Sequence, residues 1–212
     1  MFEKIVNDFS ITVGTVNGSG SQTANTTILR SLFKMGIPVS GKNLFPSNIQ
    51  GLPTWYTIRV NKDGFTARRE EHEIVVCMNP KSFPQDLAHV LPGGVFFYDD
   101  NIKLDITRDD IFAYPMPIKE IMREQKDVPT NLKDLVANMV YVGILAQTIG
   151  IDLQKIRAAL EFHFKSIGRK VSCLCVRFIH FIPVVIKRPS CNVDAFPLHR
   201  LSCWKSRDFR FF

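Results

Sequence analysis

The sequence predicts a single three-layer α/β domain with a mostly parallel sheet and an inserted hairpin, followed by an irregular basic tail. Two observations predict the domain. Segments with strand and helix periodicity alternate along residues 1–165, and a hairpin signal, Asp63–Gly64, interrupts the alternation. The tail is predicted by a third observation, because residues 166–212 show no periodicity and differ in charge.

The chain begins with a strand, a glycine-rich turn and a helix. In Ser10–Val16, polar and β-branched side chains alternate, which is typical of a strand. Apolar residues then recur at helical spacing over Ser21–Met35, and Gly36 and Pro38 supply a stop signal. This order of elements opens an α/β unit.

The middle of the chain predicts a hairpin and two further strands. Thr54–Val60 and Phe65–Arg68 flank the Asp63–Gly64 pair, whose glycine accepts the positive φ of a tight turn. Ile74–Met78 is a short apolar run, consistent with a buried parallel strand, and Val95–Tyr98 is another strand.

The last part of the domain predicts an edge strand and two helices. Ile111–Ile118 contains two prolines, which lack backbone donors, so it is an edge strand at best. Apolar residues form one broad face along Asn131–Ile149, and Gly150 ends that helix. Asp152 then caps a second helix.

Charge and cysteine content divide the chain at the same place. The 212 residues include 27 Lys or Arg and 20 Asp or Glu, for a formal net charge of +7. Residues 166–212 hold nine of the basic residues and two of the acidic ones, so residues 1–165 are neutral. Four of the five cysteines also lie in this tail. They are Cys173, Cys175, Cys191 and Cys203.

The composition argues against several functional classes. The cysteine spacing fits no zinc finger, and His72, His89 and His163 have no partner ligand at a suitable spacing, so no metal site is predicted. No nucleophile elbow is present, and no catalytic residue is predicted. Without a signal peptide or a run of about 18 apolar residues, we expect a cytoplasmic protein with no membrane span.

Two segments are candidates for a binding site. Gly18 and Gly20, between strand and helix, either cradle an anion on backbone N–H groups or form a tight structural turn. Thr23 stands where the dinucleotide pattern has its third glycine, so that fingerprint is incomplete. The segment Phe45–Tyr56 either presents polar groups on a rigid loop or is a structured crossover with core aromatics.

Five stretches, taken in order, resemble the gamma domain of 2-oxoacid:ferredoxin oxidoreductases, the family that acts on pyruvate, 2-ketoisovalerate or 2-oxoglutarate. The resemblance is closest to the gamma part of the fused alpha subunit of the 2-oxoglutarate enzymes. The stretches are Gly18–Gln22, Phe45–Pro53, Ile74–Pro80, Leu91–Gly94 and Asn138–Gly143. Departures also occur: Ser21 and Thr23 stand where the family often has glycine, and Asn48, Gln50 and Leu52 alter the second loop.

The resemblance implies a part of an enzyme that oxidatively decarboxylates a 2-oxoacid to an acyl-CoA and passes the electrons to ferredoxin. The whole enzyme would use thiamine diphosphate, iron–sulfur clusters and coenzyme A, while this chain would dock and close over coenzyme A and be inactive alone. Its partners would be the alpha-type pyrimidine domain and the beta subunit, with ferredoxin indirectly, and neither nucleic acid nor a membrane. We expect the binding residues to be Gly18, Gly20, Gln22, Asn48, Gln50, Gly51 and Thr54.

Two alternatives stay open at this point. The cationic tail is either translated in a shifted reading frame, which would make this chain a truncated alpha subunit, or a genuine segment that contacts anionic lipid or nucleic acid. The domain itself could instead be a stand-alone nucleotide-binding or protein-interaction module.

Overall fold

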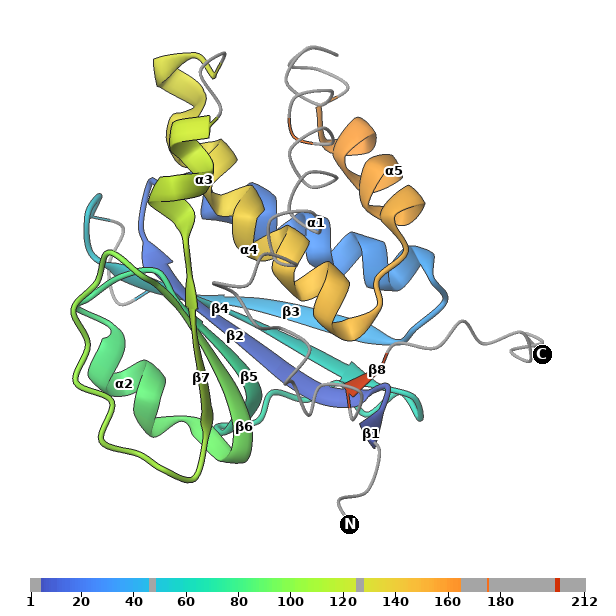
Figure 1. Ribbon diagram of the computed structural model, residues 1–212. Coiled ribbons are helices and arrows are strands. Elements are labelled where there is room, and N and C mark those ends of the chain that lie inside the picture. Colours follow the sequence, from blue (N-terminus) through green and yellow to red (C-terminus); the bar gives the residue numbers. More distant parts are fainter. Residues whose placement is uncertain (1–4, 46–48, 125–127, 165–174, 176–200, 203–212) are drawn as a thin grey trace.

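The computed structural model describes residues 5–45, 49–124, 128–164, 175 and 201–202, and Figure 1 shows their arrangement. The strands are β1 (Ile5–Val6), β2 (Asp8–Val16), β3 (Val39–Leu44), β4 (Pro53–Asn61), β5 (His72–Cys77), β6 (Val90–Asp99), β7 (Phe112–Met116) and β8 (Leu201–Ser202). The helices are α1 (Ser21–Lys34), α2 (Phe83–Ala88), α3 (Ile118–Glu124), the 3-10 turn η1 (Thr130–Leu132), α4 (Lys133–Ile149) and α5 (Leu153–His163).

Six strands form one mixed sheet in the order β3-β4-β2-β5-β6-β7. The four strands β2, β5, β6 and β7 are parallel, and β4 runs antiparallel between β2 and β3. The predicted fold class, an α/β domain with a mostly parallel sheet and an inserted hairpin, is confirmed. The proline-containing strand β7 lies at the edge of the sheet, as predicted.

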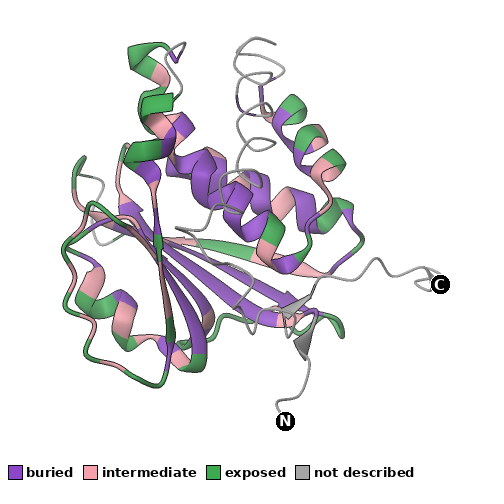
Figure 2. Ribbon diagram, in the orientation of Figure 1, coloured by how far each residue is buried: buried purple, intermediate pink, exposed green. Residues whose placement is uncertain are grey.

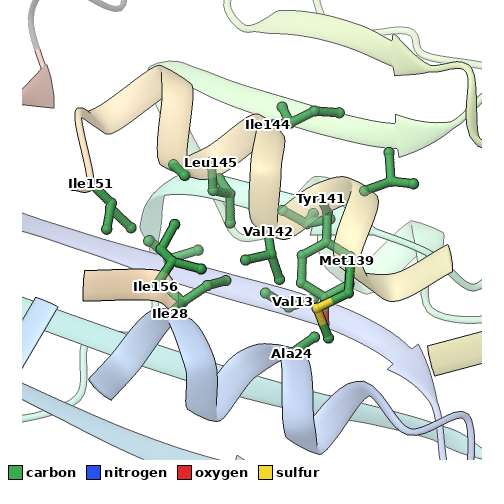
Figure 3. Close-up of a cluster of buried hydrophobic side chains, with 14 of the residues drawn as sticks. Val13, Ala24, Ile28, Met139, Tyr141, Val142, Ile144, Leu145, Ile151 and Ile156 are labelled. Carbon is green, nitrogen blue, oxygen red and sulfur yellow. The ribbon is translucent and has the colours of Figure 1, made fainter. Parts of the chain in front are cut away.

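Helices cover the sheet on both faces. In Figure 1, α1, α4 and α5 lie on one face and the short α2 lies on the other. The larger core joins the first group of helices to the sheet, and Figure 3 shows α4 crossing α1 through Met139, Val142 and Ile28. The smaller core, under α2, contains Val75 and Phe96. Figure 2 shows that the strands in the centre of the sheet are buried.

Helix α4 is the most deeply buried helix of this core. Together with η1 it spans Thr130–Ile149, and within the described ranges it is the stretch that is long and apolar enough to cross a membrane by length and composition. Eleven of its residues are buried against the rest of the domain, as in the core helix of a globular protein. Gly150, at φ 72°, ends the helix as predicted.

The predicted hairpin is in the wrong place. The turn at Asn61–Gly64 exists, but Phe65–Arg68 is not a strand, because β2 and β3 already occupy both edges of β4. The Asn61 side chain instead accepts hydrogen bonds from the backbone N–H groups of Asp63 and Phe65, at 3.0 and 2.9 Å. The inserted hairpin is β3–β4, and residues 45–52 join its strands.

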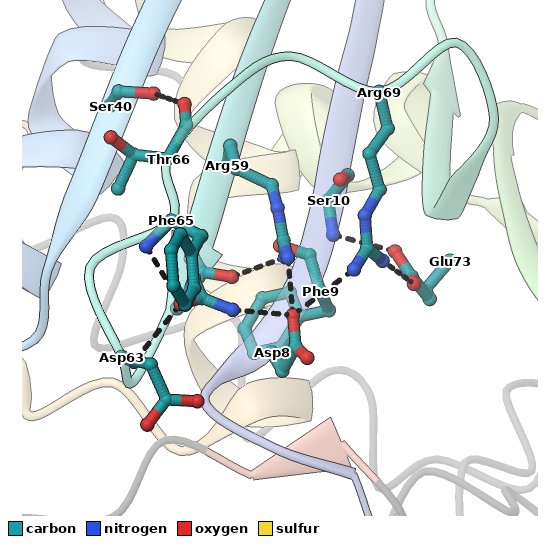
Figure 4. A network of polar contacts seen from close by, with 12 residues as sticks. Asp8, Phe9, Ser10, Ser40, Arg59, Asp63, Phe65, Thr66, Arg69 and Glu73 are labelled. Atoms are coloured by element: carbon teal, nitrogen blue, oxygen red, sulfur yellow. Dashed lines mark hydrogen bonds and ion pairs between the residues drawn. The ribbon is translucent and has the colours of Figure 1, made fainter.

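A polar network holds the loop that follows β4 (Figure 4). Arg59, which is 3% exposed, contacts the carboxylate of Asp8 at the start of β2. Arg69 bridges that carboxylate and Glu73, and Ser40 donates a hydrogen bond to the carbonyl of Thr66 at 2.6 Å. Side chains, and not a backbone ladder, therefore fold residues 61–69 against the sheet.

Little of the predicted tail falls among the described residues. Cys175 is fully buried against the larger core, and β8 pairs in parallel with β1, Leu201 opposite Ile5. The rest of residues 166–212 lies outside the described part of the chain. The boundary at residue 165 and the shifted reading frame therefore stay predictions.

Candidate functional site

The candidate site lies at the carboxyl ends of β2 and β5. The helix after β2, α1, packs on one face of the sheet, and the helix after β5, α2, packs on the other (Figure 1). In open α/β sheets, ligands bind in the crevice where consecutive connections leave on opposite faces. The glycine-rich turn after β2 is at this position.

The glycine-rich turn leaves the amino end of α1 open. Gly18 and Gly20 have φ values of 89° and 79°, a left-handed conformation that glycine adopts without strain. Gly20 is the N-cap of α1, no described side chain accepts a hydrogen bond from the first turn, and this turn contains no acidic residue. Backbone N–H groups and the positive end of the helix dipole are therefore available to an anion.

The two candidate segments of the sequence meet in the structure. Asn17, in the glycine-rich turn, makes three hydrogen bonds to the loop between β3 and β4, at Ile49, Gly51 and Leu52. Their lengths are 2.9 Å from the Asn17 amide to the Leu52 carbonyl, 3.1 Å from the Gly51 amide to the Asn17 carbonyl, and 3.1 Å from Asn17 Nδ2 to the Ile49 carbonyl. The two loops thus form one unit.

Gly18 makes close contact between these loops possible. A Cβ atom at this position would lie 2.9 Å from Cγ of Gln50, so a larger residue would push the second loop away. Gly51 also has a positive φ, 88°, but no atom would oppose its Cβ. Asn48, the remaining predicted residue of this loop, lies outside the described residues.

A cavity of about 350 Å³ brings four of the predicted residues together. Gly18, Gly20, Gln22 and Thr54 all line it, beside the amino end of α1. Gln22 is exposed, and its side-chain oxygen accepts a hydrogen bond from Nδ2 of Asn43 in β3. The cavity is lined by glycines, amides and hydroxyls, together with the aromatic residues Phe45, Trp55 and Tyr56. It contains no carboxylate, which suits a negatively charged or polar ligand.

Three residues that sequence reasoning missed support the glycine-rich turn and its flanks through hydrogen bonds. Asn138 in α4 donates a hydrogen bond to the carbonyl of Ser19 at 2.8 Å. The hydroxyl of Tyr141, fully buried, contacts Oδ1 of Asn25 at 3.0 Å, and burial raises the pKa of this phenol. Asn79 donates to the carbonyl of Thr15 at 3.3 Å. All three lie in stretches that carry the family resemblance, so the signal was present.

A buried carboxylate lies beside the site. Asp86 in α2 accepts hydrogen bonds from Nε1 of Trp55 and from Oγ of Ser82, both at 2.6 Å. Burial raises its pKa, while these hydrogen bonds oppose the shift. Sequence analysis gave Asp86 no role, because nothing in its neighbourhood predicted a helix there.

The fourth stretch of the resemblance, Leu91–Gly94, is not part of the site. It lies at the start of β6, at the opposite end of this strand from the site. Gly94 is required for packing, because a Cβ there would lie 2.7 Å from the carbonyl oxygen of Leu91.

The described residues do not fit an iron–sulfur cluster or another metal ion. Across the described ranges, no three His, Cys, Asp or Glu side chains are close enough to hold a metal. The two described thiols, Cys77 and Cys175, are buried, and burial raises the pKa of both, that of Cys175 to about 12. The other three cysteines lie outside the described part of the chain.

Comparison with known proteins gives one family. The family profile described as "Pyruvate ferredoxin/flavodoxin oxidoreductase" matches residues 10–177. Over 122 residues the chain is 28% identical to subunit alpha of 2-oxoacid:ferredoxin oxidoreductase 2 from Aeropyrum pernix. This alignment includes 57% of the present chain but only 18% of that subunit.

Solved structures share the fold. The 2-oxoglutarate:ferredoxin oxidoreductase of Magnetococcus marinus, solved with 2-oxoglutarate, coenzyme A and succinyl-CoA bound, matches with a TM-score of 0.74 and 22% identity, over 85% of this chain and 31% of that one. A pyruvate oxidoreductase subunit from Thermotoga maritima matches with a TM-score of 0.64 and 17% identity, over 82% of this chain and 93% of its own length. The gamma subunit of a keto/oxoacid ferredoxin oxidoreductase from Geobacter sulfurreducens matches with a TM-score of 0.66 and 11% identity, over 85% of this chain and 99% of its own length.

Proposed function

Because the chain belongs to the pyruvate ferredoxin/flavodoxin oxidoreductase family, we propose that it is the gamma-domain part of a 2-oxoacid:ferredoxin oxidoreductase alpha subunit. The relative from Aeropyrum pernix, an alpha subunit, supports this assignment. The present chain spans less than a third of the first curated relative and of the first solved structure, so catalysis is assigned to the assembled enzyme.

Within that enzyme, the role we propose for this chain is to bind and close over coenzyme A. The open amino end of α1 above the glycine-lined cavity is the observation that carries this role. The phosphates of coenzyme A are the kind of anion that such a helix end stabilises. Gly18, Gly20 and Gln22 would contact a phosphate, and Gln50, Gly51 and Thr54 would shape the wall or meet a neighbouring domain.

The remaining cofactors belong to other parts of the enzyme in this proposal. Thiamine diphosphate supplies the electron sink for decarboxylation, and iron–sulfur clusters conduct electrons to ferredoxin. No described side chains form a cluster-ligand set, and we place both groups on the pyrimidine domain, the beta subunit and their associated segments. The residues of this chain position coenzyme A and exclude water from it.

The test changes the charge at the helix end. Gln22→Glu puts a carboxylate in the first turn of α1, where it interacts favourably with the dipole but repels a bound phosphate. In the assembled enzyme we expect KM for coenzyme A to rise about 10-fold with little change in kcat, while the isolated chain becomes slightly more stable. An increase equivalent to about 1.4 kcal/mol is of the size expected for one such charge contact.

A matched variant keeps the test specific. Gln147→Glu adds the same charge at an exposed position near the carboxyl end of α4, and it should leave KM for coenzyme A unchanged. Gly20→Val, which strains a left-handed position, and Thr54→Arg, which fills the cavity, should also raise KM. Equal kinetics for Gln22→Glu and Gln147→Glu would contradict the proposed role.

A further inference from the structure

The buried face of α1 changes from apolar to polar at the amino end of the helix. Ala24, Ile28 and Leu32 are apolar and fully buried in the larger core. Ser21 and Asn25 lie one turn apart on the same face and are also buried, at 6% and 2% exposed. Burying polar groups is unfavourable unless they are hydrogen-bonded. This polar pair occurs where the buried face reaches the cavity beside α1, which both residues line.

Helix α4 provides a hydrogen-bond partner for this pair. The hydroxyl of Tyr141 donates to Oδ1 of Asn25 at 3.0 Å and lies 3.4 Å from the carbonyl oxygen of Ser21. Figure 3 shows the ring of Tyr141 reaching from α4 toward α1, beside Ala24. Because burial raises the pKa of this phenol, it keeps its proton and remains a donor at neutral pH. The oxygen of the Asn25 amide is therefore held by the core.

The nitrogen of the same amide is left for the cavity. Within the described part of the chain, Nδ2 of Asn25 donates to no acceptor. It is also not one of the fully buried polar atoms without a partner, such as Oγ of Ser19. Nδ2 therefore keeps accessible surface, and the cavity is the open space that Asn25 lines. An amide nitrogen carries two N–H donors, and helical side chains tilt toward the amino end of their helix.

The side chains beside Asn25 also suit an acceptor ligand. The hydroxyls of Thr15 and Ser21 lie 2.9 Å apart, line the same cavity and retain hydrogen-bonding capacity. Gln22, by contrast, is exposed, and its amide already bonds to Asn43 and Thr26. Asn25 is therefore the buried amide of this cavity whose donors are both unused and held in place.

We propose that Asn25 is a ligand-binding residue of the cavity beside α1, where its Nδ2 donates a hydrogen bond to an oxyanion at the amino end of the helix. Tyr141 is the positioning residue that keeps Nδ2 turned toward the cavity. This inference rests on the proposed function, in which the oxyanion is a phosphate of coenzyme A. It extends the site from the exposed turn into the core and makes binding depend on α4.

The side-chain amide of Asn25 gives a direct measurement on the full chain. In NMR spectra of the chain labelled with 15N, titration with inorganic pyrophosphate should shift the side-chain NH₂ signals of Asn25. Asn25→Ala identifies these signals by their absence. The NH₂ signals of Asn61, at the other end of β4 from the cavity, should not move.

Kinetics of the assembled enzyme test the contact independently. Asn25→Ala should raise KM for coenzyme A about 10-fold with little change in kcat, as expected for a lost hydrogen bond to a charged group. Ser31→Ala is the matched control, because Ser31 is a fully buried polar residue of the same helix that does not line the cavity. It should leave KM unchanged.

A double variant separates positioning from a structural role. Tyr141→Phe keeps the ring in the core and should raise KM for coenzyme A about 3-fold, because the Asn25 amide loses its orienting bond. In the Asn25→Ala background the same change should leave KM unaltered. An effect on KM of equal size in both backgrounds would show that Tyr141 does not act through Asn25. If Asn25→Ala does not fold, an unchanged KM in Tyr141→Phe overturns the proposal.

Two further results would overturn the assignment of Asn25. One is a set of Asn25 NH₂ signals that pyrophosphate does not shift, and the other is an equal KM in Asn25→Ala and Ser31→Ala. If either accompanies a raised KM for coenzyme A in Gln22→Glu, the proposed function stands and only the role of Asn25 fails. If Gln22→Glu also has no effect, both fail.

Discussion

Gly14, in the middle of β2, lies directly against the carboxylate of Asp86. A Cβ at this position would approach Oδ2 of Asp86 to 2.4 Å, so only glycine leaves room for this buried acid. Through Asp86 the same contact fixes Trp55, which lines the cavity beside α1. At the scale of single residues, the candidate site therefore depends on a glycine that does not line its cavity.

Replacing Gly14 should release this arrangement. Gly14→Ala forces Asp86 away from Trp55 and Ser82, and we expect a loss of about 2–3 kcal/mol in the free energy of unfolding, measured by urea denaturation. Asp86→Ala removes the opposing group, so Gly14→Ala should cost much less in that background. Equal costs in both backgrounds would show that the contact with Asp86 is not the cause.

His72 predicts a dependence of stability on pH. Its folded pKa of about 4 lies below the ordinary value of 6.5, so the unfolded chain takes up the proton first as the pH falls. The contribution of His72 is complete above about pH 6.5 and is lost progressively down to pH 4. The difference between these two pKa values corresponds to at most about 3 kcal/mol.

The check compares unfolding free energies across that pH range. His72→Gln cannot be protonated, so its stability should fall less than that of the wild type between pH 6.5 and 4. Asp86 has the opposite effect, because a carboxyl whose pKa is raised on folding makes the folded protein less stable as the pH rises. Glu73, Arg68 and His89 also lie near His72. A His72→Gln slope identical to that of the wild type would refute the assignment.

At the scale of secondary-structure elements, the ends of the helices match the signals in the sequence. Oδ1 of Asp152 accepts a hydrogen bond from the backbone N–H of Gln154 at 2.9 Å, which caps α5 as predicted. The amino end of α1 has no such cap. The amino ends of α2 and α4 also have no side-chain cap, so the adjoining cavity is the feature that distinguishes the amino end of α1 as a candidate site.

Removing the cap of α5 should cost stability but not binding. Asp152→Ala leaves one amide of the first turn unpaired, and we expect a loss of about 1 kcal/mol in the unfolding free energy. Asp105→Ala, at an exposed position outside the helices, is the control and should change little. Affinity for coenzyme A should be equal in both variants. A loss below about 0.3 kcal/mol would mean that α5 does not depend on this cap.

At the scale of the whole molecule, the two hydrophobic cores each bury one of the described cysteines. Cys77 in β5 belongs to the core under α2, and Cys175 belongs to the core of α1, α4 and α5. Both thiols are fully buried, and burial raises the pKa of each. A thiolate, the reactive form, is therefore rare at both positions until the chain unfolds.

Alkylation tests whether the region around Cys175 packs in this way. We expect Cys77 and Cys175 to react with iodoacetamide at the same slow rate in the native chain and rapidly in urea, as followed by peptide mass spectrometry. Cys77 serves as the internal reference for a core thiol. Rapid labelling of Cys175 in the native state, with Cys77 still protected, would contradict its burial.

The shifted reading frame is a separate prediction, tested by nucleotide sequencing across codons 155–215 and translation in all three frames.

Sequence reasoning predicted the elements that have strong local signals. The periodicity of Ser10–Val16 and Ser21–Met35, the prolines of the edge strand, and Gly150 with Asp152 each act within a few residues. β3, α2 and α3 were missed because they are short and have no clear apolar period. The hairpin was misplaced because Asp63–Gly64 does form a turn, while the partner of β4 is decided by which strand edges are free.

The sequence by itself determined the α/β class, the glycine turn and the family resemblance, because these depend on local conformation and on residue order. Only the tertiary structure decided that Asn17 joins the two candidate loops, that Asn79, Asn138 and Tyr141 support the turn, and that Asp86 holds Trp55. Such contacts join residues as far as 119 positions apart. They form only when parallel strands bring their ends together and the helices after them pack on opposite faces, and no local pattern encodes that geometry.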